Sequence, residues 1–446
     1  MCGGIAVAIV AGGGSAGGVH AQEAPLTVHE AVELALDRHP EVQVARALRN
    51  GAAAEVGEAR GAWWPSLSVQ GTLTRFQEPM LVAPLHGFDL STAPPFDRTL
   101  IRGGVHAGWT LFEGGARGAR VDRTAAGEAA AETDLRSSEM RLTTEVVVTY
   151  LRVLTLKGVL AAEDLRLESL RAERERVDRL LTEGEAPEVE LYRAEASIAR
   201  AEADRVETAA RLEAEQRQLE RLADLEPFAV TAERLAPVEL ARPRLEESRE
   251  ALLDRAVAAN PGVASARHQA EAAEADRGLA KAEWFPSLEV FGDLLTYGSQ
   301  EGRFDTEWQA GIGLRYPLFV GGARAKRVER ATALRNSAEQ AARRAELAVA
   351  GEADRALATV RATEAQSEAY TAAVAHLQEV VRVERLALDQ GAGVQTDFLQ
   401  AEAELLEARA ARLEAHNLNV AARVELARVL GDLTPAWLAE NLENGR

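Results

Sequence analysis

The chain has 446 residues, of which 47% are apolar and 5% aromatic, and it carries a formal net charge of −19. An acidic balance of this size argues against nucleic acid as a partner. The scarcity of aromatic residues argues against a large mixed core, whereas long stretches of Ala, Arg, Leu and Glu are typical of long or coiled helices.

Residues 1–21 resemble a secretory signal peptide, with an apolar core at 5–10 and a small-residue cleavage pattern that ends at Ala21. No Lys or Arg precedes Ala21, so the usual basic start of a signal is missing. Either the true start lies upstream or the signal is a weak one. Cys2 is the single cysteine, so a chain cleaved after Ala21 would have none and would need no disulfide chemistry in an oxidising periplasm.

Two short helices open the first repeat, which we assign to residues 22–240. Thr27 and Glu30 form a capping-box pattern that begins the first helix. His39-Pro40 ends this helix and begins the second, which runs to about residue 62. Beyond it, the apolar residues recur at every second position instead of every three or four. This change of period predicts that a helix gives way to strands, at 66–76 and 101–112, each with one apolar and one polar face.

A long helix is predicted next, at 115–183, followed by a turn and a return helix at 188–225. A helix of about 70 residues spans roughly 100 Å and must therefore lie along neighbouring helices. The segment 226–245 contains prolines and is interpreted as an irregular connector.

The whole pattern then repeats, and we assign the second repeat to residues 241–446. Asn260-Pro261 corresponds to His39-Pro40, and both strand exits, at 111–117 and 318–324, read Leu-Phe-x-Gly-Gly-x-Arg. The predicted elements are strands at 288–297 and 308–318, a long helix at 322–390, a return helix at 395–430 and a connector at 432–446.

The two points where a helix gives way to a strand are expected to lie at a membrane surface. Their residues are Trp63, Trp64 and Pro65 in the first repeat and Trp284, Phe285 and Pro286 in the second. Tryptophan is favoured where an apolar layer meets water. Strands of about ten residues with one apolar face have the length of outer-membrane strands. We therefore expect the strands to cross an outer membrane, with lipid against their apolar faces.

Four strands in one chain cannot close a membrane barrel, for which about eight is the smallest number, and open edges cannot face lipid. The expected architecture is therefore mainly α with a membrane β part. Three copies would form a 12-strand β-barrel continuous with a 12-helix α-barrel of roughly 100 Å in length. A helical tube attached to a membrane barrel is a conduit.

In the order and spacing of these duplicated motifs, the chain resembles the TolC-like outer-membrane efflux proteins over nearly all of its length after residue 21. The resemblance rests on the proline helix starts, the Pro-Ser-Leu junctions, the strand exits and the helical tip that contains Asp397-Phe398-Leu399-Gln400-Ala401. It implies a homotrimer in the cell outer membrane that extends into the periplasm. It also implies that this trimer is the passive exit duct of a tripartite efflux pump or a type I secretion system.

The partners implied by the resemblance are a periplasmic adaptor, also called a membrane fusion protein, and an inner-membrane transporter. The alternative is a periplasmic coiled-coil adaptor or structural scaffold without a channel. Such adaptors typically carry one helical hairpin between compact β domains, whereas this sequence predicts two hairpins and four amphipathic strands.

The resemblance places a channel entrance at the helical tips. Relatives carry acidic residues that ring a constricted periplasmic entrance, and Asp397 matches the first acidic position of that motif. Gln400 stands where a second carboxylate is often found, which weakens the expectation of a strongly cation-binding entrance. Glu190 is the first-repeat equivalent of Asp397. Alternatively, Asp397 could cap its helix, because Asp-x-x-Gln has the spacing of a capping box.

The turns beside the entrance are the expected contacts of the adaptor. They contain Gly184 and Pro187 in the first repeat and Gly391 and Gly393 in the second. We take Pro187 as the first helical residue of its return helix, and its equivalent in the second repeat is Val394. This would place Asp397 inside the first helical turn.

Nothing in the sequence points to catalysis. The histidines have no metal-ligand spacing, and the three methionines give no sign of a copper or silver pathway. No nucleophile and base form a recognisable constellation. We expect no enzyme activity, no cofactor and no bound metal, and the sequence does not indicate the cargo.

Overall fold

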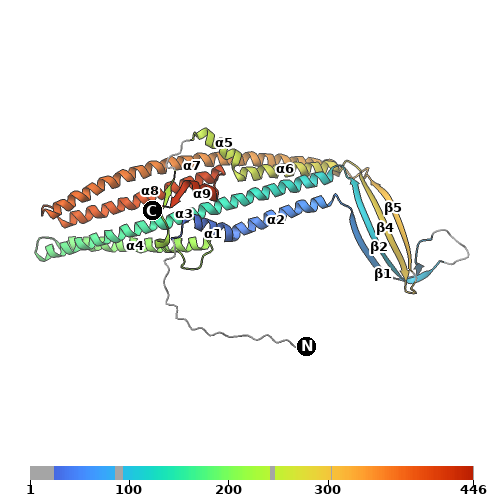
Figure 1. Ribbon diagram of the computed structural model, residues 1–446, viewed down its shortest axis with the longest axis horizontal. Coiled ribbons are helices and arrows are strands. Elements are labelled where there is room, and N and C mark those ends of the chain that lie inside the picture. The colour runs from blue at the N-terminus through green and yellow to red at the C-terminus, as the bar shows by residue number, and fades with distance from the viewer. Residues whose placement is uncertain (1–24, 86–93, 242–246, 303, 445–446) are drawn as a thin grey trace, which may run out of the picture.

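The computed structural model describes residues 25–85, 94–241, 247–302 and 304–444. The predicted signal at 1–21, which includes Cys2, lies outside these residues, as does part of each predicted connector. Long helices run side by side along the molecule, and a small sheet stands at one end of them (Figure 1).

The two halves of the chain contain the same series of elements. The first half has α1 (Val28–Arg38), α2 (Pro40–Gly61), β1 (Ser66–Leu81), β2 (Phe96–Phe112), α3 (Ala116–Thr182) and α4 (Glu188–Leu222). The second half has α5 (Arg249–Ala259), α6 (Pro261–Ala282), β4 (Ser287–Ser299), β5 (Phe304–Arg315), α7 (Ala323–Asp389) and α8 (Gln395–Leu430). Both α3 and α7 have 67 residues, so each is roughly 100 Å long.

Side-chain caps fix the helix starts that the sequence predicts. The side chain of Thr27 accepts a hydrogen bond from the backbone N–H of Glu30, whose carboxylate accepts one from the backbone N–H of Thr27, so the capping box is confirmed. Pro40 and Pro261 are each the first residue of a helix, where the missing N–H costs nothing. The Asn260 side chain accepts from the second residue of α6 at 2.9 Å.

The first two strands are longer than predicted. The expected ranges were 66–76 and 101–112, but after a register shift between Arg75 and Met80 the ladder continues to the pair Leu81 and Phe96. Pro79 lies within β1, although proline cannot donate to a ladder. However, β1 is the edge strand of the sheet, where a missing donor is tolerated.

The second pair of strands is displaced from its prediction. β4 is Ser287–Ser299 rather than 288–297, and β5 is Phe304–Arg315 rather than 308–318. The last pair of the ladder is Ser287 with Arg315, because Pro317 has no N–H with which to extend it. The apolar residues at 318–320 therefore lie in the turn that leads to α7.

The long helices begin and end one residue inside their predicted bounds. Gly115 and Gly322 are N-caps in the left-handed conformation, and Glu183 and Gln390 are C-caps, all of which the prediction counted as helical. The return helix α4 ends at Leu222 rather than at 225, because the chain leaves the helix at Asp224, where φ is +50°.

The connectors are more ordered than predicted. They contain η1 (Ala232–Arg234), β3 (Val238–Leu240), α9 (Pro435–Asn441) and β6 (Leu442–Asn444). β3 pairs with β6 in an antiparallel ladder, which joins the middle of the chain to its C-terminal end. Beneath them lies the larger apolar core, centred on the fully buried Tyr150. The Tyr150 hydroxyl lies 2.8 Å from two carbonyl oxygens, those of Leu26 and Ala236.

The large sheet is antiparallel throughout, in the order β1-β2-β4-β5. Helices α2, α3, α6 and α7 lie side by side and lead into these four strands (Figure 1). At the opposite end, α3 turns into α4 and α7 turns into α8, so two helical hairpins form the tips.

Candidate functional site

The register of the large sheet places most of the polar side chains on one face. Directly paired residues point to the same face of a sheet. His106 of β2 is paired with Asp293 of β4, which is paired in turn with Gln309 of β5. Hydrogen bonds of 2.6 and 2.8 Å connect the Asp293 carboxylate to the His106 and Gln309 side chains. The same face carries Ser66, Ser68, Gln70, Thr72, Arg102, Thr110, Glu289, Glu307 and Arg315. This is the polar face.

The opposite face of the sheet is almost wholly apolar. It carries Leu67, Val69, Leu73, Ile101, Val105, Trp109, Leu288, Val290, Leu294, Trp308, Ile312 and Leu314. Val69 is 80% exposed and Trp308 is 79% exposed in the single chain. An apolar surface of this extent requires a covering that one chain does not supply.

The predicted junction residues stand where the helices end and the strands begin. Pro65 and Pro286 directly precede β1 and β4, and the Trp63, Trp64, Trp284 and Phe285 side chains are exposed. The Trp109 side chain donates a hydrogen bond to the Trp63 carbonyl oxygen at 2.9 Å. Whether a membrane surface passes here stays a prediction.

An arginine at the start of each long helix holds the aromatic residues of its junction. The guanidinium of Arg117 lies 4.5 Å from the ring centroid of Trp63 and donates to the Leu111 carbonyl oxygen at 2.8 Å. Arg324 lies 5.8 Å from the ring centroid of Trp284 and donates to the carbonyl oxygen of Pro317. The two arginines are only 7% and 6% exposed.

Our sequence reasoning missed both arginines as functional residues. The signal was present, because each is the last residue of the duplicated Leu-Phe-x-Gly-Gly-x-Arg exit. The motif marks the repeat in the sequence, but it does not reveal which aromatic ring or carbonyl oxygen its arginine contacts.

The two helical tips have the same turn. Gly184 and Gly391 adopt left-handed φ values of +78° and +71°, and in each the next residue donates back to the carbonyl five positions earlier. This is the Schellman motif, in which glycine avoids the clash of a side chain. Gly393 is required for another reason, since a Cβ there would lie 2.8 Å from the Leu388 nitrogen.

The return helices begin at residues 188 and 395 as predicted, but the alignment that took Pro187 as the first helical residue is wrong by one position. Pro187 is the N-cap of α4 and not its first helical residue, and Val394 is the N-cap of α8. Both have extended backbone, which proline and valine accept readily. Glu190 and Asp397 therefore occupy the third helical position, where the helix dipole favours a carboxylate. The alternative that Asp397 is the N-cap is wrong.

Asp397 and Gln400 line a groove of about 710 Å³ between α3 and α8. Six carboxylates border it, against two arginines. The acidic residues are Glu163, Glu173, Asp397, Glu404, Glu407 and Glu414, and the arginines are Arg166 and Arg176. The pKa of Arg176 is raised, first by its hydrogen bond to Glu173 and further by the charge of Asp397. We call this surface the acidic groove.

Glu190 does not join the acidic groove. It lies on α4 and forms an ion pair of 2.8 Å with Arg193, so the structure brings Asp397 and Gln400 together and leaves Glu190 apart. The sequence reasoning overlooked Glu404 and Glu407. Their spacing was the available signal, because Asp397 and Glu404 are seven residues apart, as are Gln400 and Glu407, and such residues share a stripe of a coiled helix.

One face of the helix layer is continuous with the polar face of the sheet. On α3 it carries Arg120, Arg141, Glu145, Arg152, Arg166 and Glu173, and on α8 it carries Gln400, Glu404, Glu407, Glu425 and Arg428. Arg120 borders the same depression as Ser287 and Arg315 of the polar face. The opposite face of α3 is buried at Leu142, Val146, Tyr150 and Val153, in the core shared with α1, α9 and β3. We call the uncovered side the free face.

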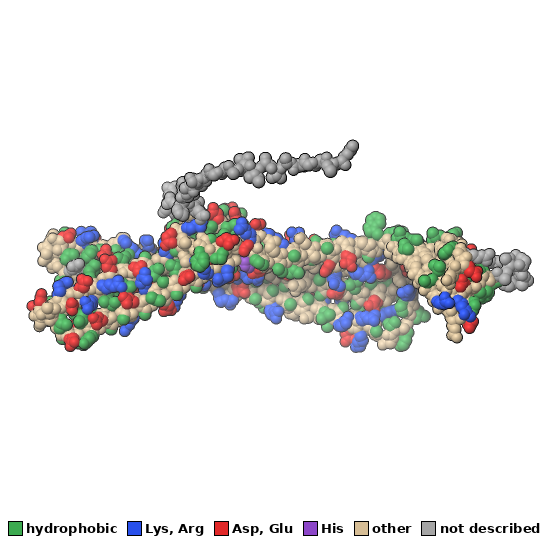
Figure 2. Space-filling view, turned by 90° about the horizontal axis from the view of Figure 1, so that it is seen from below, with side chains coloured by type: hydrophobic (Ala, Val, Ile, Leu, Met, Phe, Trp, Pro, Cys, Tyr) green, Lys and Arg blue, Asp and Glu red, His purple; other side chains and the backbone are tan. Residues whose placement is uncertain are grey.

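Among the described residues, no helix has the length and apolar character of a membrane span. In the same part of the chain, no three histidine, cysteine or acidic side chains are grouped as metal ligands. Lys, Arg, Asp and Glu side chains are instead spread along the helical part (Figure 2).

The fold is that of solved outer-membrane channels. VceC of Vibrio cholerae superposes with a TM-score of 0.71 and 19% identity, over 91% of this chain and 96% of VceC. CmeC of Campylobacter jejuni gives 0.72 and 16%, over 93% and 88%. MtrE of Neisseria gonorrhoeae in its open state gives 0.71 and 19%, over 91% of each chain. A comparison with curated proteins finds no significant match.

The family profile of outer membrane efflux proteins matches residues 31–223 and 252–432, which is most of the chain and includes both helical hairpins. This is a family of outer-membrane efflux channels and not of enzymes. The chain therefore belongs to the outer membrane efflux protein family, as its resemblance to the TolC-like proteins predicts.

Proposed function

We propose that three copies of this chain form an outer-membrane channel, which is the passive exit duct of a tripartite efflux pump or a type I secretion system. The observation that carries this proposal is the continuity of the polar strand face with the free face of the helices. A solute that follows this face passes from the acidic groove at the tips to the far end of the sheet along a surface that is mainly polar, with Phe291, Leu295 and Tyr297 as apolar exceptions on the sheet.

The unpaired edges of the chain support a ring of three. β1 and β5 are the two edges of the sheet, and exposed strand edges tend to pair with another chain. The helix layer ends in the same way, because α2 exposes Val44 and Leu48 and α7 exposes Leu347. Edge-to-edge association of three copies would close a 12-strand barrel and a 12-helix tube, covering all these residues.

The helical tips combine acidic grooves with exposed apolar side chains, which are features expected of a channel entrance that binds a periplasmic adaptor. Three acidic grooves around one axis would form a cation-attracting ring at the end farthest from the sheet. Val189, Tyr192 and Val394 are exposed beside the two Schellman turns, and apolar and acidic side chains mix at this end (left in Figure 2). We assign docking to the turns that contain Gly184, Pro187, Gly391 and Gly393.

Neighbouring substitutions on β5 test the channel. Trp308→Arg places a charge on the apolar face and is expected to prevent membrane assembly, since arginine at the bilayer midplane costs about 2–4 kcal/mol per chain. Gln309→Arg places the same charge on the polar face and is expected to leave assembly intact. The measurements are the heat-sensitive trimer band in detergent and stepwise conductance in a planar bilayer. If the wild type gives no conductance steps, or if both variants assemble equally, the proposed channel is wrong.

A further inference from the structure

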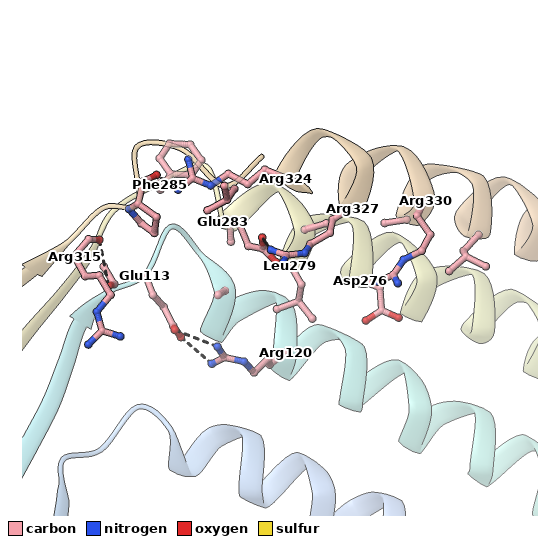
Figure 3. Close-up of a pocket in the computed structure, with 18 of the residues that line it drawn as sticks. Glu113, Arg120, Asp276, Leu279, Glu283, Phe285, Arg315, Arg324, Arg327 and Arg330 are labelled. Carbon is pink, nitrogen blue, oxygen red and sulfur yellow. Dashed lines mark hydrogen bonds and ion pairs between the residues drawn. The ribbon is translucent and has the colours of Figure 1, made fainter. Parts of the chain in front are cut away.

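Where the helices meet the sheet, the free face is hollowed by a depression of about 630 Å³. Its walls come from the start of α3, the end of α6, the start of α7 and the adjoining ends of β4 and β5 (Figure 3). Ser287 and Arg315, which belong to the polar face, lie at its edge. Under the proposed function, on which this inference rests, the depression opens into the lumen of the channel.

Five arginines and three carboxylates line this depression, in a chain whose net charge is −19. The arginines are Arg120, Arg315, Arg324, Arg327 and Arg330, and the carboxylates are Glu113, Asp276 and Glu283. The local balance is therefore opposite in sign to that of the acidic groove at the tips. We call this cluster the arginine pocket.

Three of these arginines are already engaged. Arg120 forms two hydrogen bonds with the Glu113 carboxylate, at 2.8 and 3.1 Å, and Arg327 is paired with Glu283. Arg324 is buried against the aromatic residues of its junction. Their charges hold the pocket together and are not available to a ligand.

The other two arginines are exposed and unpaired within the described part of the chain. Neither Arg315 nor Arg330 forms an ion pair with a described residue. Arg330 reaches from α7 over α6, and Arg315 extends from the end of β5 (Figure 3). The nearby carboxylate of Asp276 is instead 3.8 Å from Arg123. The pocket therefore has two guanidinium groups whose donors can bind an anion in bidentate fashion.

The floor of the pocket is apolar. Leu279, Phe285, Val320 and Leu334 line it together with five alanines and a proline. An inorganic ion would use the guanidinium groups alone, whereas an organic anion could bury an apolar body on this floor.

We infer that the arginine pocket binds small organic anions in which a phosphate, sulfate or carboxylate group is joined to an apolar body. Arg315 and Arg330 lie at opposite ends of the pocket (Figure 3), so each offers its own guanidinium to the anionic group, and the apolar floor between them, which includes Leu279, contacts the apolar body. Such molecules would pause at the membrane end of the duct after passing the acidic groove. The site is a property of each chain, so a trimer would carry three.

Calorimetric titration of the detergent-solubilised wild type with phenyl phosphate, which is water-soluble and does not enter micelles, tests this inference. The double variant Arg315→Gln/Arg330→Gln is expected to bind at least about tenfold more weakly, because it loses both charged hydrogen-bond donors. Arg136→Gln, which removes an exposed arginine of α3 outside the pocket, is expected to bind as the wild type does. Inorganic phosphate is expected to bind more weakly than phenyl phosphate, and phenyltrimethylammonium not at all.

Equal binding by the wild type and the double variant would refute the site, as would equal binding of phenyltrimethylammonium. Equal affinity for inorganic and phenyl phosphate would refute the role of the apolar floor. Conductance is recorded for the same preparations without phenyl phosphate. Wild-type protein that binds phenyl phosphate but gives no conductance would refute the proposed channel and leave the site standing, so the two failures are distinguishable.

Discussion

Removing the arginine that holds a junction should loosen the sheet from the helices. In Arg324→Ala, the Pro317 carbonyl oxygen loses a charged hydrogen bond, which typically contributes about 1.5–3 kcal/mol. The guanidinium also leaves the rings of Trp284 and Tyr316, which lie 5.8 and 5.3 Å from it, and such a contact adds about 1 kcal/mol. We therefore expect a loss of about 3 kcal/mol in the unfolding free energy of each chain.

Tryptophan fluorescence during urea unfolding in detergent measures this loss. Of the six tryptophans, all but Trp437 lie in the junctions or strands, so the signal reports mainly on this end of the molecule. Arg324→Lys keeps the charge but not the planar fork, and it should recover only part of the loss. Arg136→Ala, on an exposed part of α3, should change the free energy by less than about 0.5 kcal/mol. An Arg324→Ala transition at the wild-type urea concentration would refute the anchoring role.

Three further predictions concern the tips and the ends of the helices. Asp397→Asn combined with Glu404→Gln should lower the cation preference of the reconstituted channel, and an unchanged reversal potential in a salt gradient would contradict the entrance role. Gly431→Ala should lower hydrogen-exchange protection more than Gly391→Ala. Both residues have left-handed φ, a conformation that costs alanine about 1–2 kcal/mol. Only at Gly431 would the new methyl group also meet a backbone oxygen, at 2.4 Å. Burial raises the pKa of the Asp432 carboxyl above its ordinary value of 3.8. The protonated carboxyl therefore stabilises the fold below pH 3.8, and this stabilisation is lost as the pH rises through the raised pKa. Asp432→Asn should therefore have a higher urea midpoint than the wild type at neutral pH and lose this advantage in acid.

Features that depend on local chemistry were predictable from the sequence. Proline is favoured at the first helical position after an N-cap, and Pro40 and Pro261 occupy that position here. Apolar residues recur every three to four positions in a helix and every two in a strand, so the sequence predicts both helix-to-strand junctions to within about one residue. The strand ends were less predictable, because the effect of Pro79 depends on whether its strand is at an edge, and the sequence alone does not reveal the strand order.

The connectors could not be predicted, because their structure depends on contacts between distant parts of the chain. β3 is three residues long and pairs with β6, about two hundred residues later in the chain. No periodicity can appear in so short a strand. Tyr150 shows the same limit, since its hydroxyl bridges the carbonyl oxygens of Leu26 and Ala236. A sequence can indicate that a tyrosine ring is buried, but it does not indicate which groups accept from the hydroxyl. Those two acceptors become known only when the segments around Leu26, Tyr150 and Ala236 are seen together.

The acidic groove shows how neighbouring residues of a helix can supply the negative charge that one position lacks. Gln400 stands where a carboxylate was expected, and read alone it argues against a cation-attracting ring. On α8, however, Glu404 and Glu407 continue the same stripe one and two turns further along. The Gln400 side chain donates to the Glu404 carboxylate at 3.1 Å, so the amide orients the neighbouring acid rather than opposing it. In the proposed tube, a solute would experience the summed field of the wall, so the position of each charge along the stripe would matter less than the total. The acidic character of this surface therefore does not depend on residue 400.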